Sequence, residues 1–419
     1  MGVLGGLAAV CWFSVGGGSR IIREHSFNIA SIVGIAPDGR LAVFDTNGLA
    51  FIDEHGEVQS VPVSSAVPWI GYPVTLAGTN GMVIYQMLPG GGSSLRMLDW
   101  SGKEKWAFQT NVFIGLPTSD AIGNVSFISS MLGTNQEVHS IDPAGRTRWT
   151  FGYATWSGGT YGQAPVMSPD GRLAIVGDRR SGVIMLDSNG GEQWRYPAIN
   201  GNVTLTAGAF APGGDLLIRD GLQLLRFDPK GNLKWRLALA DAVGDRGAVG
   251  YEVLTPKFGP DGVVYCPIGR WIFAVTANGV LKWQFRRDGI DSKYSNVVMG
   301  WPQDWGTLNA DGELIVVAGD WESAPVTMPG GAVGSIVLAN NERLSCLSSE
   351  GVLKWEQTLP SSMVWSLPRN RLDLTMLWKS RMGLRASKGL GRPTISSNGM
   401  IYLSGWSKGQ ATIWTIRGD

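Results

Sequence analysis

The chain has 419 residues, of which 44% are hydrophobic and 16% charged, and its 35 basic and 34 acidic residues leave a formal net charge of +1. Disordered chains combine low hydrophobicity with high net charge, so this composition excludes a largely disordered protein. A general nucleic-acid binder needs a basic excess to neutralise phosphates, so we also expect no nucleic-acid partner.

The first predicted element is a strand near the amino terminus. Residues 1–19 carry no charge, and VCWFSV, from Val10 to Val15, has the pattern of a short buried strand. Trp12 precedes Gly39 by 27 residues, which is within the Trp-to-Gly spacing of most later repeats. We therefore expect a strand at about residues 8–16 that completes the last repeat. A secretory leader or membrane anchor is the alternative, although a basic start and a clear cleavage site are missing.

Eight turns with a glycine follow, and each leads into a short apolar run. The runs include LAVF from Leu41, LAIV from Leu173 and LIVV from Leu314. Apolar runs of this length, bounded by turn residues, predict buried β-strands, and their recurrence predicts a repeat architecture. The turn glycines are spaced 42 to 50 residues apart, with 87 before the last: Gly39, Gly81, Gly123, Gly171, Gly214, Gly262, Gly312 and Gly399.

A second turn recurs within the repeats: a small polar residue, glycine three positions later and Trp four positions after that. The first residue can hydrogen-bond its own turn, glycine can take the left-handed backbone, and Trp can cover the side of a neighbouring unit. Six copies hold this frame: Asp99, Gly102 and Trp106; Asp142, Gly145 and Trp149; Asp187, Gly190 and Trp194; Asp228, Gly231 and Trp235; Thr276, Gly279 and Trp283; Ser348, Gly351 and Trp355.

These repeats predict an all-β fold. Each unit has the pattern strand, tight turn, strand, loop, strand, tight turn, strand, and eight such units fit the chain. Four-stranded blades must stack around an axis to bury both faces. We therefore expect one domain over residues 1–419: an eight-bladed β-propeller of four-stranded antiparallel blades, closed by the N-terminal strand. A long insertion, about residues 357–392, separates blades seven and eight.

The second turn resembles the A-x-D-x-x-x-G-x-x-x-W docking motif of the quinoprotein-type, or PQQ-like, propeller repeat family, and the resemblance covers essentially the whole chain. The family contains quinone-dependent dehydrogenases and cofactor-free, BamB-like scaffolds. Many of the dehydrogenases have a vicinal Cys pair, whereas Cys11, Cys266 and Cys346 are far apart here, and the motif's alanine is present only at Ala274. The chain is thus closest in character to the BamB-like kind. The resemblance implies a non-catalytic binding or assembly scaffold that is exported, periplasmic or at the cell surface.

Other catalytic chemistry has little support in the residue pattern. His25, His55 and His139 are isolated, and neither a zinc-binding spacing nor a GxSxG motif occurs. We interpret the three cysteines as small buried residues. We therefore predict no catalytic, cofactor-binding or metal-binding residues. A quinone-dependent oxidoreductase holding PQQ with Ca²⁺, and a carbohydrate-binding or carbohydrate-processing propeller, are the alternatives.

Long segments between the predicted strands indicate where a partner would bind. In a four-stranded meander the two tight turns lie at one end, and the long connections lie at the other. The long connections are 152–164, 238–251, 286–305, 320–333 and 357–392, and rigidly held loops often carry function. Their aromatic residues are typical of protein interfaces and of sugar binding. The candidate residues on this face are Trp156, Tyr161, Trp301, Trp305, Trp321, Arg369, Arg371, Trp378, Lys379 and Arg381.

The insertion also carries the one strong charge imbalance. From Arg369 to Arg392 there are seven basic residues and one acidic residue, Asp373, so this stretch is +6 and the rest of the chain is −5. The stretch from Leu372 to Met382 lacks Gly and Pro and could form a short helix. A functional interpretation is docking to an acidic protein or to an anionic membrane surface, and a solvated loop is the alternative. We expect a protein partner for a chain that is itself a monomer, with carbohydrate as a further option.

Overall fold

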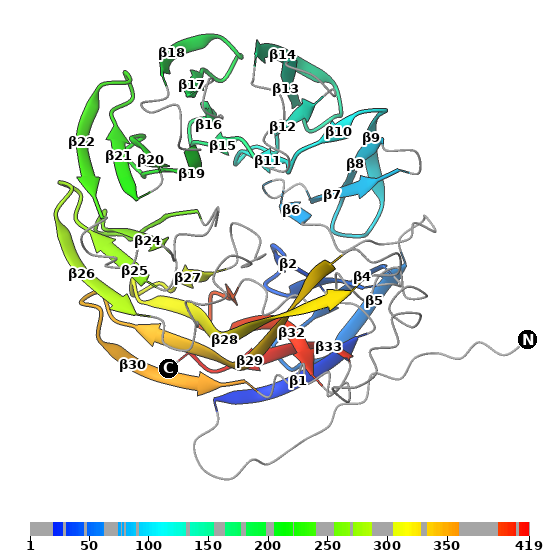
Figure 1. Ribbon diagram of the computed structural model, residues 1–419. Helices are drawn as coiled ribbons and strands as arrows, with labels where there is room; N and C mark the ends of the chain where they lie inside the picture. The colour runs from blue at the N-terminus through cyan, green and yellow to red at the C-terminus, as the bar shows by residue number, and fades with distance from the viewer. Residues whose placement is uncertain are drawn as a thin grey trace, which may run out of the picture. The chain divides into compact units, whose positions relative to one another are not determined.

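A computed structural model of the chain describes residues 20–27, 31–45, 48–62, 74–76, 78, 81–88, 92–130, 135–154, 164–176, 182–197, 205–220, 222–239, 255–268, 271–286, 305–327, 333–359, 393–407 and 410–418. These residues form strands and turns without a helix, so the described part of the chain has no helical membrane span. The predicted fold class is confirmed: the strands form eight antiparallel sheets, the blades of a β-propeller (Figure 1).

One compact unit, Met1–Val63 with Arg287–Asp419, holds three blades. We number the blades in chain order, so this unit contains blades 1, 7 and 8. Blade 1 consists of β2 (Ser31–Ile35), β3 (Leu41–Asp45), β4 (Gly48–Ile52) and β5 (Val58–Pro62). Blade 7 consists of β27 (Gly306–Leu308), β28 (Leu314–Thr327), β29 (Val333–Leu347) and β30 (Leu353–Thr358). Blade 8 consists of β31 (Thr394–Ile395), β32 (Ile401–Ser407), β33 (Gln410–Ile416) and β1 (Ile21–Phe27).

The second compact unit, Ser64–Arg286, holds blades 2 to 6. Blade 2 is β6 (Val74–Leu76), β7 (Met82–Met87), β8 (Ser93–Leu98) and β9 (Glu104–Thr110). In blade 3 the first strand is split into β10 (Phe113–Ile114) and β11 (Thr118–Ser119), which both pair with β12 (Val125–Ser130), followed by β13 (Asn135–Ile141) and β14 (Thr147–Ala154). Blade 4 is β15 (Val166–Met167), β16 (Leu173–Val176), β17 (Val183–Leu186) and β18 (Glu192–Tyr196). Blade 5 is β19 (Leu205–Phe210), β20 (Leu216–Asp220), β21 (Gln223–Phe227) and β22 (Leu233–Ala238), and blade 6 is β23 (Lys257–Phe258), β24 (Val264–Ile268), β25 (Trp271–Val275) and β26 (Leu281–Arg286).

The core lies between neighbouring blades of each unit. Val183 and Met185 of β17 pack with Ile218 of β20 and Phe227 of β21, which joins blades 4 and 5. Every residue of β16 and β17 is buried, whereas the outer strand β18 alternates between exposed and half-buried residues. A middle strand with both faces covered needs a continuous apolar run, which explains why LAIV and VIML carry no polar residue.

An N-terminal strand completes blade 8, but it is a later segment than expected. The strand is β1, and Arg23 pairs with Thr415 and His25 with Ile413 of β33. The predicted strand at residues 8–16 lies outside the described residues. We selected that segment for its apolar run and Trp spacing, whereas the choice of β1 depends on pairing with a strand almost 400 residues away. That pairing leaves no local pattern in the sequence.

The predicted loop at 320–333 is, for most of its length, a continuation of blade 7. After an irregularity between Ala318 and Asp320, β28 and β29 stay in register from the Asp320–Asn340 pair to the Thr327–Val333 pair. The strand β27 pairs with β28 only at Leu314–Val316, and β28 and β29 continue as a pair past this point (Figure 1). The prediction of a loop was wrong for residues 320–327, because these residues pair with Val333–Asn340 of β29.

Candidate functional site

Most of the residues predicted on the binding face lie outside the described residues. This applies to Trp156, Tyr161, Trp301, Arg369, Arg371, Trp378, Lys379 and Arg381, and to the stretch expected as a short helix, 372–382. Trp321 lies in β28, where it pairs with Ala339. Trp305 directly precedes β27, and its side chain is only 3% exposed. Trp305 therefore belongs to the core of blade 7 instead of to an exposed face.

The six-copy motif brings neighbouring blades together. The Trp of one blade lies against the glycine of the next: Trp149 against Gly190, Trp194 against Gly231 and Trp235 against Gly279. A Cβ added to Gly231 would come within 2.7 Å of the Trp194 ring. These glycines also have φ between +82° and +87°, a backbone conformation that other residues rarely adopt. The position therefore excludes other residues both by this conformation and by the contact of an added Cβ with the Trp ring.

Hydrogen bonds hold the same indoles in place. The Nε1 of Trp149 donates to the carbonyl of Ser188 at 3.1 Å, and that of Trp194 donates to Pro229 at 3.0 Å. Trp235 donates to Ala277 at 2.9 Å. In each case the acceptor stands two positions before the motif glycine. Trp106 lies against Gly145 in the same way, but its buried Nε1 has no hydrogen-bond partner among the described residues.

The first residue of the motif stabilises its own turn. The Oδ1 of Asp142 accepts from the backbone N–H of Ala144 and of Arg146, both at 2.9 Å. The hydrogen bond from the Arg146 backbone is the main cause that holds the pKa of Asp142 below its ordinary value. The Oγ1 of Thr276 accepts from Val280 at 3.1 Å, so a hydroxyl takes the place of the carboxylate in blade 6.

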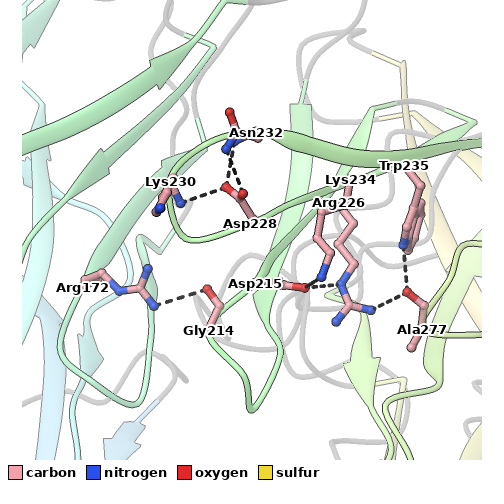
Figure 2. A network of polar contacts seen from close by, with 10 residues as sticks. All are labelled: Arg172, Gly214, Asp215, Arg226, Asp228, Lys230, Asn232, Lys234, Trp235 and Ala277. Atoms are coloured by element: carbon pink, nitrogen blue, oxygen red, sulfur yellow. Dashed lines mark hydrogen bonds and ion pairs between the residues drawn. The ribbon is translucent and has the colours of Figure 1, made fainter.

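A partly buried ion cluster connects blade 5 to the motif turn of blade 6 (Figure 2). One oxygen of Asp215, Oδ2, accepts from Arg226 Nε at 2.8 Å and from Lys234 Nζ at 2.9 Å. Arg226 Nη1 donates to the carbonyl of Ala277 at 2.9 Å, the same oxygen that Trp235 reaches. The side chains of Asp215 and Arg226 are each only 10% exposed. The cluster is therefore a structural link between blades, and the sequence analysis missed it.

The acid–lysine pair of this cluster recurs in blade 7, and the two pairs share a sequence signal. An acidic residue directly follows the first turn glycine in blades 5 and 7, and a Lys directly precedes the motif Trp of the same blade. In blade 7 these residues are Glu313 and Lys354, and they also form an ion pair. Asp215 and Glu313 directly precede the second strand, and Lys234 and Lys354 lie at the start of the fourth. The pairing is thus visible in the repeats once they are aligned.

Comparisons with known proteins agree with this motif geometry. Residues 134–285, from β13 to β26, match the family model described as outer membrane protein assembly factor BamB. The segment that matches is therefore similar to PQQ-like propeller repeats. The predicted resemblance to that family is confirmed over this segment, which contains four of the six motif copies.

Solved structures that are similar to the chain share little of its sequence. Sqt1 of Saccharomyces cerevisiae is similar over 93% of this chain and 99% of its own, with a TM-score of 0.53 and 8% identity. A streptogramin B lyase is similar over 94% of this chain and 97% of its own, with a TM-score of 0.47 and 11% identity. No curated protein sequence matches the chain. The likeness to Sqt1 supports the fold alone.

A serine, a histidine and a glutamate lie together in blade 3, on β12 and β13. Ser129 Oγ is 2.8 Å from His139 Nε2, and Glu137 Oε2 is 3.5 Å from the same nitrogen. Burial lowers the pKa of His139, although the Glu137 charge opposes this. A catalytic relay needs the carboxylate on Nδ1, opposite to the serine. Because both groups contact Nε2, this cluster lacks the arrangement of a nucleophile, a base and an orienting acid.

Two of the three cysteines are buried, as expected, and Cys11 lies outside the described residues. Burial raises the pKa of Cys266 to about 11, with a smaller opposing effect from the Arg219 charge. Burial and the neighbouring Glu313 carboxylate raise the pKa of Cys346 to about 12. A thiolate is the reactive form, so both thiols are held in the unreactive state at neutral pH. Among the described residues, no cluster of three His, Cys, Asp or Glu could hold a metal ion.

Proposed function

We propose that the protein is a non-catalytic scaffold that binds a protein partner. The observation that carries this proposal is the match of residues 134–285 to the family model of an outer membrane assembly factor. The interlocked repeats support it, because a rigid framework positions binding loops with little loss of conformational freedom. On the same basis we propose that the protein is exported and works in the periplasm or at the cell surface.

The proposed binding surface is the end of the blades opposite the tight turns. In blades 1 to 7 the tight turns join strands one and two, and strands three and four, at one end of the sheet. The fourth strands β14, β22, β26 and β30 therefore finish at the other end. The long segments 155–163, 240–254, 287–304 and 360–392 begin there, and they contain most of the aromatic residues predicted for this face.

The basic stretch from Arg369 to Arg392 is the proposed contact for an acidic partner surface. Its charge of +6 stands out in a chain whose net charge is +1. A local excess of one sign accelerates encounter with an oppositely charged partner, and added salt weakens this effect. An anionic lipid surface has the same charge, so the experiment must separate protein from lipid.

The decisive experiment compares two charge-neutralised variants of the full chain. One variant replaces Arg369, Arg371, Lys379 and Arg381 by Ala, and the control replaces four cations at or beside the tight turns, Lys103, Lys105, Arg146 and Lys230. Capture from an envelope extract, followed by crosslinking mass spectrometry, is measured at low and high salt. We expect the first variant to lose most of the captured partner and of its salt dependence, and the control to behave as wild type. Equal capture by both variants would contradict the proposed surface, and binding to anionic vesicles alone would contradict a protein partner.

The proposal includes no redox cofactor, and native mass spectrometry tests this directly. The purified protein is measured before and after addition of pyrroloquinoline quinone with Ca²⁺, together with its absorbance spectrum. We expect no stoichiometric mass increase and no quinone chromophore, because the vicinal Cys pair of many quinone-dependent relatives is missing from the sequence. Uptake of one quinone per chain would replace the scaffold proposal by an oxidoreductase.

A further inference from the structure

The outer part of the β28–β29 ribbon has two strands where the blade has four. Within blade 7, β27 pairs with β28 as far as Val316, and β30 pairs with β29 from Arg343 onward. From Asp320–Thr327 against Val333–Asn340, the two strands pair only with each other among the strands that the structure describes. At about 3.3 Å per residue this stretch is about 26 Å long. A two-stranded ribbon is only marginally stable in water, so a further strand would stabilise it.

The two edges of this ribbon differ in how well they are protected against pairing. The β28 edge carries Asp320, Glu322 and Pro325. Charges and proline are the residues by which natural sheet edges avoid further pairing, since proline has no N–H to donate. The β29 edge, from Val333 to Asn340, has the sequence VGSIVLAN, with neither charge nor proline. Three β-branched residues also give it a high strand propensity.

We propose that the β29 edge between Gly334 and Asn340 pairs antiparallel with the same edge of a second copy of this chain. The two ribbons would then form one four-stranded sheet across a two-fold axis. Two copies of this uncharged segment can pair without placing a charge opposite an apolar residue. They also bring no like charges together. A two-fold arrangement brings this segment against itself, so one chain supplies both matching edges.

The protected β28 edge makes the assembly a closed dimer. In the four-stranded sheet, the two outer strands are both β28, which carry the acidic residues and the proline. A third copy would have to pair with one of these edges, where like charges and a missing N–H oppose it. The inference is independent of the proposed scaffold function and replaces the expectation of a monomer.

Sedimentation velocity of the full chain tests the dimer. Two variants are compared with wild type, each with a lysine at one of two residues that pair across the ribbon. Val337 of β29 pairs directly with Ser323 of β28. Val337→Lys puts like charges together at the two-fold axis, whereas Ser323→Lys adds the same charge on the already protected edge. We expect wild type and Ser323→Lys to sediment at twice the chain mass of 44.9 kDa, and Val337→Lys to sediment as a monomer. Circular dichroism and melting temperature check that both variants are folded.

Disulfide trapping gives a second measurement, which detects the dimer by a bond that forms and not by dissociation of a variant. In a Cys11→Ser background, Val337→Cys should crosslink to its own copy under mild oxidation, and Ser323→Cys should not. A monomeric wild type, or a dimer that both lysine variants keep or both lose while folded, would overturn the proposal. Equal crosslinking of the two cysteine variants would also overturn it, because the contact would then not be specific to the β29 edge.

Discussion

Gly231 takes a φ of +87° in the second turn of blade 5, and the indole of Trp194 lies where a Cβ would be. Gly39, in the first turn of blade 1, has the same φ of +87° but nothing within 4 Å of its added Cβ. The pair therefore separates two contributions that usually occur together: the cost of left-handed backbone and the cost of contact. At the scale of the residue, this is the difference between a turn glycine and a docking glycine.

We expect Gly231→Ala to destabilise the protein more than Gly39→Ala. Left-handed backbone costs about 1–2 kcal/mol in both variants, and overpacking against Trp194 adds about 1–3 kcal/mol at Gly231 alone. Urea unfolding followed by tryptophan fluorescence measures both. Equal losses of stability would show that Trp194 moves aside at little cost and that the indole contact does not discriminate against a methyl group.

A buried histidine, His25, and a partly buried one, His139, are expected to make the protein less stable in mild acid. Burial lowers the pKa of His25, helped by the Arg23 charge, and burial also lowers the pKa of His139. Below about pH 6.5 the unfolded chain binds protons that the folded chain does not, so stability falls as the pH decreases from there. Asp220 acts in the opposite direction, since burial raises the pKa of its carboxyl.

The histidine contribution can be isolated by a difference between variants. We expect the melting temperature to fall from pH 7.5 to 5.5, and to fall less in His139→Gln, whose amide can still hydrogen-bond Ser129. His55→Gln serves as the control, because the His55 side chain is 76% exposed. If His139→Gln kept the full pH dependence of wild type, protonation of His139 would not be linked to folding.

At the scale of the element, blade 5 carries an arginine where blades 2 and 4 have a methionine. Arg226 pairs with Trp235 across β21 and β22, and the equivalent partners of Trp106 and Trp194 are Met97 and Met185. Removing one member of a buried ion pair leaves an uncompensated charge, whereas replacing the pair by apolar residues is often neutral. The methionines of blades 2 and 4 thus indicate which replacement the site accepts.

We expect Asp215→Asn to destabilise the protein by about 3 kcal/mol, because Arg226 then stays buried without its carboxylate. Adding Arg226→Met should restore most of this loss, since the double variant then has the methionine that blades 2 and 4 have opposite their motif Trp. Urea unfolding of the wild type, the two single variants and the double variant gives the coupling energy. A double variant that is no more stable than Asp215→Asn would mean that Arg226 contributes mainly through its packing and its bond to Ala277.

The sequence predicted local elements better than long-range ones. Turn glycines such as Gly171 and Gly190 reveal the blades because turn chemistry is confined to a few adjacent residues. The identity of β1 was not predictable in this way, since IIREHSF has a weak strand pattern and is selected by pairing with β33. Trp305 was misassigned because the exposure of a side chain depends on neighbours that are distant in sequence. The Asp215–Arg226 ion pair was missed because Arg226 also donates to the carbonyl of Ala277, which belongs to another blade.

Closure of blade 8 also changes how the repeat motif is used. The outer strand β1 precedes β33 by almost 400 residues, so the two paired strands are not joined by a motif turn. Instead the guanidinium of Arg20 lies 4.7 Å from the centre of the Trp355 ring, and its backbone N–H donates to Gln357 Oε1 at 2.7 Å. A cation over the indole face thus takes the place that glycine has in the other contacts. The same docking surface of Trp therefore serves two different partners.

At the scale of the whole molecule, we expect residues 64–286 to fold when expressed alone. This unit contains blades 2 to 6, and the contacts between those neighbours, from Trp106–Gly145 to Trp235–Gly279, are all internal to it. In repeat architectures each unit is stabilised mainly by its nearest neighbours, so a run of five keeps four complete interfaces. The fragment should show a β-sheet circular dichroism spectrum and a cooperative urea transition. Trp194→Ala, which removes the contact with Gly231 in the middle of the run, should shift that transition to lower urea. A fragment that is unfolded at all urea concentrations would mean that the five blades need the rest of the chain, as expected for a single domain over residues 1–419.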